Sequence, residues 1–192
     1  MKIIGIGGTN GSGKDILSQI LEDDYGWLFI SSSRDLIIPE LKRLGRPLER
    51  EQMAALTAEW RRQRGHGAVV DKAIELFQEK NKSHTYKGLV ISSIRHPWEA
   101  DRIQELGGKM VWTDADPKVR YERIFSRGQG DKDKKTYEEF LTEEQAEMHH
   151  SGDEATLNWQ GVKDQADIFI TNDGNDIEEF KKTAAKALGL KT

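Results

Sequence analysis

The residues best suited to chemistry lie near the start of the chain. Gly8, Gly13 and Lys14 follow the spacing G-x-x-x-x-G-K, which is typical of a phosphate-binding P-loop. Glycines let the backbone curl so that consecutive N–H groups point inward and bind phosphate oxygens. The helix that follows adds the positive end of its dipole, and the lysine supplies a mobile cation for the β- and γ-phosphates. The spacing therefore predicts that a nucleotide binds at Gly8, Thr9, Asn10, Gly11, Ser12, Gly13, Lys14 and Asp15.

Short apolar runs predict the strands that position this loop. One run opens the chain, and the others are residues 27–30, 88–91, 110–112 and 167–170. Stretches with apolar residues at helical spacing separate them. This alternation predicts an α/β fold in which helices cover both faces of a five-stranded, mostly parallel sheet. The strand–loop–helix context also favours a phosphate site over a glycine-rich turn with a surface lysine.

The carboxyl ends of parallel strands are where ligands bind in sheets of this kind. The segments that follow the five predicted strands are 8–15, 31–35, 92–95, 114–116 and 171–173. They are rich in glycine, serine, aspartate and arginine, which can bind phosphate or a divalent cation. We therefore expect the functional residues in these segments.

The composition is that of a soluble globular protein. The chain has 192 residues, of which 32% are charged and 36% hydrophobic, with a net charge of −4 and no cysteine. The lack of cysteine excludes disulfides and thiolate sites, and the acidic balance argues against general nucleic-acid binding. No stretch approaches the ~20 apolar residues of a membrane span, and a predicted strand opens the chain, so we expect neither signal peptide nor membrane association. We expect a cytoplasmic protein, and its oligomeric state is left open.

Two arginines share one face of a predicted helix. Asp116 and Pro117 predict where that helix begins, and Arg123 and Arg127 lie four residues apart on it. Phosphoryl transfer needs positive charge around the moving phosphoryl group, which arginines supply with two hydrogen bonds each. We therefore expect Arg123 and Arg127 to act in catalysis with Lys14. The alternative is a solvated helix end with exposed arginines.

With these residues in place, the chain resembles the P-loop kinases of the nucleoside-monophosphate-kinase superfamily. It is most similar to small archaeal-type proteins described as nucleotide-kinase-like or dephospho-CoA-kinase-like. The resemblance covers nearly the whole chain. It rests on the P-loop, on Arg95 after the third strand, on D-P-x-x-R-x-E-R-x-x-x-R-G over residues 116–128 and on A-D-I-F-I-x-N over residues 166–172.

The resemblance implies a three-layer P-loop NTPase fold in a single kinase domain with two small insertions. An acceptor-binding segment would span about residues 32–66, and a lid about 127–155. The core would comprise about residues 1–31, 67–126 and 156–192. The resemblance also implies ATP and Mg²⁺ as cofactors and a small phosphate acceptor as partner.

Further site residues follow from the same resemblance. Arg95 is expected to bind the acceptor phosphate or to bridge both phosphates, which places it in catalysis, and Asn172 is expected beside the nucleotide. An arginine of the acceptor segment should face the site, but the cluster of arginines at 61, 62 and 64 leaves open which one does. The full set expected to bind the acceptor is Arg34, Asp35, Arg61 and Arg95.

Three positions depart from the family pattern. Asp15 replaces the serine or threonine that binds Mg²⁺, and Ser92 stands where an acidic residue commonly ends the third strand. One carboxylate has thus entered the P-loop while another is missing across the site, so we expect Asp15 and Ser92 to face the metal. Monophosphate kinases also usually carry an arginine where this chain has Ile38, although Arg34 could serve from another direction.

The leading hypothesis is an ATP- and Mg-dependent kinase that transfers the γ-phosphoryl group to a nucleoside monophosphate or similar nucleotide. Dephospho-CoA is the alternative acceptor, and its ribose hydroxyl would need a general base, for which Asp35 is the candidate. A nucleotide-binding regulatory ATPase is the alternative from another class of function. A kinase of DNA or RNA ends is disfavoured by the acidic balance, and the sequence leaves open whether ATP or GTP is the donor.

Overall fold

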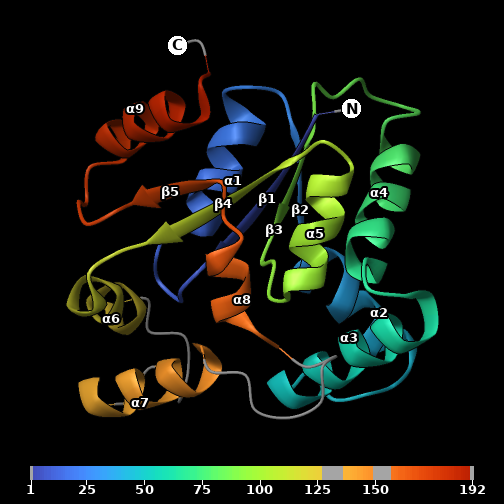
Figure 1. The fold of residues 1–192 in the computed structure, drawn as a ribbon, viewed down its shortest axis with the longest axis horizontal. Coiled ribbons are helices and arrows are strands. Elements are labelled where there is room, and N and C mark those ends of the chain that lie inside the picture. The colour runs from blue at the N-terminus through green and yellow to red at the C-terminus, as the bar shows by residue number, and fades with distance from the viewer. Residues whose placement is uncertain (1, 127–135, 149–156, 191–192) are drawn as a thin grey trace.

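The computed structural model of the chain, which describes residues 2–126, 136–148 and 157–190, is built around a five-stranded sheet. The strands are β1 Ile3–Gly8, β2 Leu28–Ser31, β3 Leu89–Ser92, β4 Lys109–Asp114 and β5 Ile168–Thr171. They lie in the order β2-β3-β1-β4-β5, and every neighbouring pair is parallel (Figure 1). The predicted parallel sheet is confirmed, with strand bounds displaced by one or two residues at most.

The central position in the sheet belongs to β1. Ile3 is in register with Leu89 of β3 on one side, and Ile4 with Lys109 of β4 on the other. The strands β2 and β3 thus lie on one side of β1, and β4 and β5 lie on the other. The strand order reverses at the carboxyl end of β1, and open parallel sheets bind their ligands at such a point. This topology places the P-loop at the middle of the functional edge.

Helices cover both faces of the sheet. Their bounds are α1 Lys14–Asp23, α4 Ala68–Lys80, α5 Pro97–Glu105, α8 Trp159–Asp164 and α9 Ile177–Leu188. Side chains alternate between the two faces along each strand. Ile3 accordingly belongs to the core under α4, α5 and α8, whereas Ile4 and Ile6 belong to the core under α1 and α9. The predicted three-layer arrangement is confirmed (Figure 1).

One element, α8, was not predicted from the sequence. It has six residues, of which Trp159 and Val162 are buried against the sheet. The Asn158 side chain caps it by accepting a hydrogen bond from the Gly161 N–H at 2.8 Å. Two apolar residues are too few to reveal a helical period, so the packing of α8 determines its conformation more than its sequence pattern does.

The segment between β2 and α4 forms a small layer of its own. It contains a six-residue π-helix, η1 (Ser32–Ile37), followed by α2 (Ile38–Arg43) and α3 (Arg50–Arg64). Their apolar side chains pack into a third core together with the start of α4. Pro39, which would interrupt the interior of a helix, lies in the first turn of α2, where its missing N–H costs nothing.

Two further helices, α6 (Pro117–Ser126) and α7 (Tyr137–Met148), follow β4. Thr136 and Glu139 form a capping box at the start of α7, because the side chain of each accepts a hydrogen bond from the other residue's N–H, at 3.2 and 2.8 Å. In Figure 1, α6 and α7 lie with α2 and α3 at the end of the molecule toward which β4 points. Part of the predicted lid lies outside the described residues. Arg127 also lies outside them.

The described helices include none whose length and apolar character would let it cross a membrane.

Candidate active site

The P-loop has a backbone that requires glycine at two positions. Gly11 has φ +81° and Gly13 has φ +94°, a region that other residues rarely adopt. A Cβ atom on Gly13 would lie 2.3 Å from Nδ2 of Asn172, and one on Gly11 would lie 2.8 Å from the carbonyl oxygen of Arg120. The loop leads directly into α1, which begins at Lys14. Its shape suits the cradle of N–H groups that binds phosphate.

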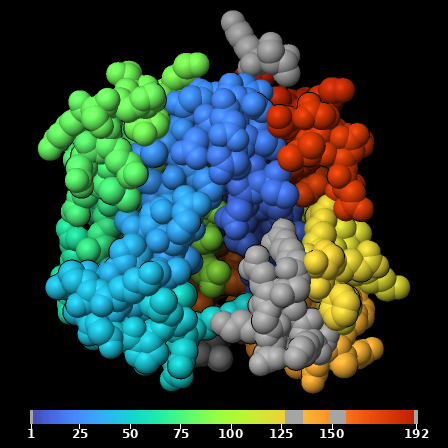
Figure 2. All heavy atoms as spheres, turned by 180° about the vertical axis from the view of Figure 1, so that it is seen from behind, coloured from blue at the N-terminus to red at the C-terminus, as the bar shows by residue number. Residues whose placement is uncertain are grey.

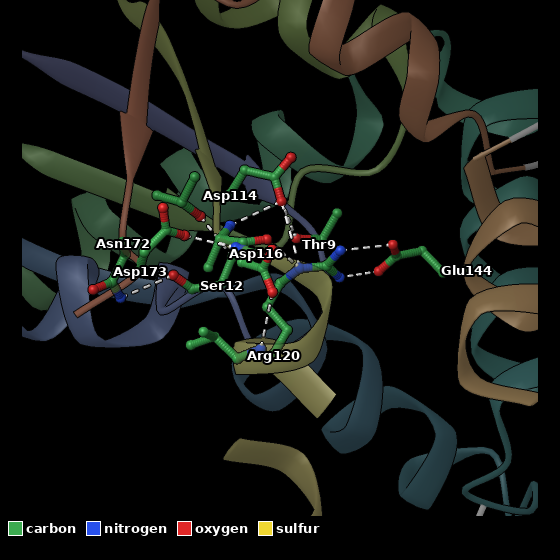
Figure 3. A network of polar contacts seen from close by, with 12 residues as sticks. Thr9, Ser12, Asp114, Asp116, Arg120, Glu144, Asn172 and Asp173 are labelled. Atoms are coloured by element: carbon green, nitrogen blue, oxygen red, sulfur yellow. Dashed lines mark hydrogen bonds and ion pairs between the residues drawn. The ribbon is translucent and has the colours of Figure 1, made fainter. Parts of the chain in front are cut away.

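Side chains from β4 and from the end of β5 hold this loop from behind. Thr9 Oγ1 donates to Asp114 Oδ1 at 2.8 Å, and the hydroxyls of Ser12 and Thr113 lie 2.9 Å apart. The Asn172 amide donates to the carbonyl oxygen of Ser12 at 3.0 Å (Figure 3). Asn172 is thus in contact with the P-loop, and its side chain binds the loop backbone.

Arg123 joins the P-loop to the segment after β5. Its guanidinium donates to the carbonyl oxygens of Asn172 at 2.8 Å and Gly11 at 3.3 Å, and also to that of Gly174. A cavity of about 220 Å³ lies beside these groups, with the apolar side chains of Ile16, Ile177 and Phe180 in its wall. Arg123 therefore lies on the P-loop side of the site.

A second arginine of α6 forms a buried ion pair that sequence analysis did not single out. The Arg120 side chain is 3% exposed and donates to the Ala115 carbonyl oxygen at 2.7 Å. It also donates two hydrogen bonds to the Glu144 carboxylate, which links α6 to α7 (Figure 3). The motif D-P-x-x-R contained a signal for this residue, because Arg120 lies in the first turn after the predicted helix start.

The two residues expected to face the metal are in direct contact. The Ser92 hydroxyl donates to Asp15 Oδ1 at 2.9 Å, so the P-loop and the end of β3 meet here. Mg²⁺ prefers oxygen ligands and usually binds one or two carboxylates together with substrate phosphates and water. Over residues 2–126, 136–148 and 157–190, no cluster of three or more acidic, histidine or cysteine residues could hold a metal on its own. This donor set fits an ion that arrives with a nucleotide.

A second cavity, of about 260 Å³, lies between η1, α3 and the segment after β3. Hydroxyl and charged side chains line much of its wall, and these are Ser32, Ser33, Arg50, Thr57, Arg61, Ser93, Arg95, Glu99 and Glu147. Ser93 has φ +68°, and no other non-glycine residue of the described part has a positive φ. Backbone strain of this kind costs about 1–3 kcal/mol and is concentrated at functional sites. Figure 2 shows this side of the molecule hollowed between the blue atoms of the N-terminal region and the cyan atoms of the α3 region.

Arg95 contributes a buried cation to this cavity. Its guanidinium lies 5.2 Å from the centre of the Trp159 ring, and it makes no hydrogen bond or ion pair with any residue that the structure describes. Burial lowers the pKa of the Arg95 guanidinium below its ordinary value, and the nearby Glu147 carboxylate opposes that shift. An arginine keeps its charge even so. Among the described residues, Arg95 is therefore a buried cation that could bind an anionic ligand.

Of the three clustered arginines in α3, Arg61 is the one that faces inward. Its side chain is 1% exposed and forms an ion pair with Glu99, whose side chain is 2% exposed. The second Glu99 oxygen accepts a hydrogen bond from the Arg95 N–H at 3.2 Å. Arg62 and Arg64 are exposed. Arg61 thus lines this cavity, but Glu99 in the same wall already balances its charge.

The structure does not bring Arg34 and Asp35 to this cavity. Arg34 is exposed, lies 4.7 Å from the centre of the Phe29 ring and forms an ion pair with Asp35. The Asp35 carboxylate also accepts a hydrogen bond from the Ser31 N–H at 2.7 Å. The wide π-turn of η1 directs Ser32 and Ser33 toward the cavity instead. The expected grouping of Arg34 and Asp35 with Arg61 and Arg95 does not occur.

Two residues that sequence analysis missed connect the P-loop with the cavity. Arg50 Nη1 donates to Glu147 Oε1 at 2.7 Å, and Asn10 Nδ2 donates to Glu147 Oε2 at 3.2 Å. Arg50 begins α3 and Glu147 lies near the end of α7. Glutamates recur along α7, so the sequence offers no sign that this one differs from the rest.

Comparison with known proteins assigns the chain to a family. A family model described as an AAA domain (AAA_18) matches residues 4–148. The chain belongs to this AAA-domain family. Among curated relatives, a UPF0200 protein of Pyrobaculum aerophilum is 27% identical over 190 residues, covering 98% of this chain and 97% of the relative. A UPF0200 protein of Sulfurisphaera tokodaii is 29% identical over 192 residues, covering 98% and 96%.

Solved structures similar to this AAA-domain protein include small kinases. TT1252 from Thermus thermophilus has a TM-score of 0.56 and 24% identity, covering 97% of this chain and 95% of that one. Shikimate kinase from Bacteroides thetaiotaomicron has a TM-score of 0.56 and 16% identity, covering 99% of both chains. At these identities the likeness concerns the fold. The predicted similarity to small P-loop kinases and the predicted P-loop NTPase fold are confirmed.

Proposed function

We propose that this AAA-domain protein is an ATP- and Mg-dependent kinase that transfers the γ-phosphoryl group to a nucleoside monophosphate or similar nucleotide. The observation that carries the proposal is the Arg95 guanidinium, which lines the second cavity and pairs with no acidic side chain of the described residues. The proposal assigns about residues 32–66 to the acceptor-binding segment and about 127–155 to a lid, within one kinase domain.

The donor nucleotide would bind along the P-loop. The loop N–H groups and the start of α1 would hold the β- and γ-phosphates, with Lys14 as the mobile cation. The cavity beside Arg123, with apolar side chains such as Phe180 in part of its wall, suits a nucleobase. When bound, Mg²⁺ would neutralise charge on the phosphate oxygens, and Asp15 and Ser92 are the residues that would face it.

The charges around the acceptor cavity favour an anionic acceptor over a hydroxyl. A hydroxyl must lose its proton to a general base, whereas a phosphate monoester is already an anionic nucleophile. Glu99 is engaged by Arg61, and Glu147 by Arg50. Asp35, the candidate base for a ribose hydroxyl, lies outside the cavity and is held by Arg34 and the Ser31 N–H. Arg95 can instead bind a phosphate group with two hydrogen bonds.

A coupled assay of ADP release tests this function. We expect turnover with at least one nucleoside monophosphate, and only background release with dephospho-CoA, with shikimate or with water alone. Turnover with dephospho-CoA or shikimate would contradict the anionic acceptor. ADP release that is equal in water and in the presence of every acceptor would support a nucleotide-binding regulatory ATPase in place of a kinase.

Replacement of Asp15 by asparagine is expected to reverse how nucleotide binding depends on Mg²⁺. Without metal, the Asp15 carboxylate repels the triphosphate, so the variant should bind a non-hydrolysable ATP analogue about 10-fold more tightly than wild type (~1.4 kcal/mol). With Mg²⁺, the ion is the largest local charge and the carboxylate attracts it, so the order should reverse. Calorimetric titrations with excess EDTA and with saturating Mg²⁺ measure both affinities.

The control for this titration is Asp23→Asn, which removes the same charge from the exposed far end of α1. It should bind the analogue as wild type does under both conditions. Should wild type and Asp15→Asn keep the same order of affinity with and without metal, Asp15 would not face the ion.

A further inference from the structure

The Glu147 carboxylate lies where the two substrates of the proposed kinase would meet. One oxygen accepts a hydrogen bond from Asn10 of the P-loop at 3.2 Å, and the other accepts one from Arg50 at 2.7 Å. Glu147 also lines the acceptor cavity beside Arg95. This single carboxylate therefore joins the donor loop, the acceptor-binding helix α3 and helix α7.

The charge on Glu147 is of the same sign as both substrates. A triphosphate bound at the P-loop would bring its anionic oxygens toward Asn10, and an acceptor phosphate would be drawn toward Arg50 and Arg95. Like charges at close range repel, and the repulsion strengthens where water is excluded. Glu147 in its present position therefore opposes the binding of either anion, while it balances the charge of Arg50.

Arg50 is suited to change partners when an acceptor arrives. Its side chain is 58% exposed and that of Glu147 is 22% exposed, so the ion pair is open to solvent on the Arg50 side, and solvent-screened pairs contribute little stability. By contrast, the Arg61–Glu99 pair in the same wall is buried on both sides. A phosphate dianion carries more charge than a carboxylate and offers more acceptor oxygens. A phosphate can therefore replace Glu147 as the ion-pair partner of Arg50 with little loss of free energy.

Resting on the proposed function, we propose that Arg50 is an acceptor-binding residue held by Glu147 until substrates bind, and that donor and acceptor must displace the same Glu147 carboxylate. Each substrate, by displacing the Glu147 carboxylate, would then remove the charge that repels the other substrate. The two would bind with positive cooperativity through this residue. Glu147 is a positioning residue in this proposal, because it acts through Arg50 and Asn10.

Calorimetric titration of Glu147→Gln tests the coupling, with AMP as the acceptor probe and a non-hydrolysable Mg·ATP analogue as the donor probe. In wild type, saturating analogue should tighten AMP binding by about 10-fold. In Glu147→Gln, AMP alone should bind about 10-fold more tightly than to wild type, and the analogue should add less than about twofold. The matched control is Glu138→Gln, an exposed glutamate at the other end of α7, which should behave as wild type.

The role of Arg50 is tested in the Glu147→Gln background, where no carboxylate is left unpaired by its removal. Adding Arg50→Met should weaken AMP binding by about 10-fold or more and leave the affinity for the Mg·ATP analogue unchanged. Equal coupling in wild type and Glu147→Gln would overturn the shared-carboxylate role, and so would the absence of AMP binding from both. The assay of ADP release is independent of this result, so coupled binding without phosphoryl transfer would contradict the proposed function and leave this inference standing.

Discussion

Replacement of Lys14 by alanine is expected to lower the rate of phosphoryl transfer by about 10²–10³-fold, because electrostatic groups that contact migrating charge have effects of this size. Lys14 begins α1 directly after the P-loop and is largely buried, so its ammonium group stays near the phosphate site. The rate would be measured by ADP release with the acceptor that wild type prefers. Thermal unfolding followed by circular dichroism would verify that the variant folds.

The control for Lys14 is Lys182→Ala on α9, which removes an exposed lysine far along the chain from the P-loop. Its turnover should match that of wild type. Were Lys14→Ala to turn over at a rate close to wild type with every acceptor, the P-loop lysine would have no part in the reaction.

Glu99→Gln is expected to lower the free energy of unfolding by about 3–5 kcal/mol, because it removes the carboxylate that forms an ion pair with the buried charge of Arg61. Arg61 and Glu99 have side chains that are 1% and 2% exposed, so water does not compensate for the loss. Glu99 also accepts a hydrogen bond from the Arg95 N–H, which weakens when the carboxylate becomes an amide. Urea denaturation followed by fluorescence measures the change.

Two further variants test whether the loss of stability comes from the buried charge or would follow any substitution in this region. The double variant Arg61→Met/Glu99→Leu removes both charges and should recover most of the lost stability, since apolar residues of similar volume often replace a buried ion pair without loss. Glu75→Gln breaks the exposed pair with Arg64 and should change stability by about 0.5 kcal/mol or less. A loss in Glu99→Gln no larger than in Glu75→Gln would contradict the buried-charge explanation.

Much of the fold could be predicted because its signals are local. Strands appeared as short apolar runs, and helix starts as capping residues. Asp116, predicted to begin a helix, accepts hydrogen bonds from the N–H groups of Lys118 and Val119, as a capping residue should. Thr136 and Glu139 have the T-x-x-E spacing of a capping box and form one. The P-loop combines residue spacing with a strand–loop–helix context, so its position followed directly from the sequence.

The parts of the site that escaped prediction depend on tertiary contacts. Asp35 lies after β2 as expected, but the π-turn of η1 directs it away from the cavity. No residue type in the sequence predicts a turn of this kind. Arg50 and Glu147 meet across 97 residues of sequence. Nothing in the pattern of either helix indicates that contact. The contact of Asp15 with Ser92 could be suggested only because both depart from the family pattern at facing positions.

The central place of β1 has a consequence for how the chain acquires its activity during synthesis. β1 comes first among the five strands in chain order, yet its two neighbours are β3 and β4, which end at Ser92 and Asp114. Parallel strands so distant in sequence pair late, because the loop between them must be closed before any contact forms. The P-loop further depends on Asn172, which follows β5, the final strand. A nascent chain that still lacks β5 therefore carries the P-loop sequence without the support that shapes it, so nucleotide binding would signal that the chain is complete through its fifth strand.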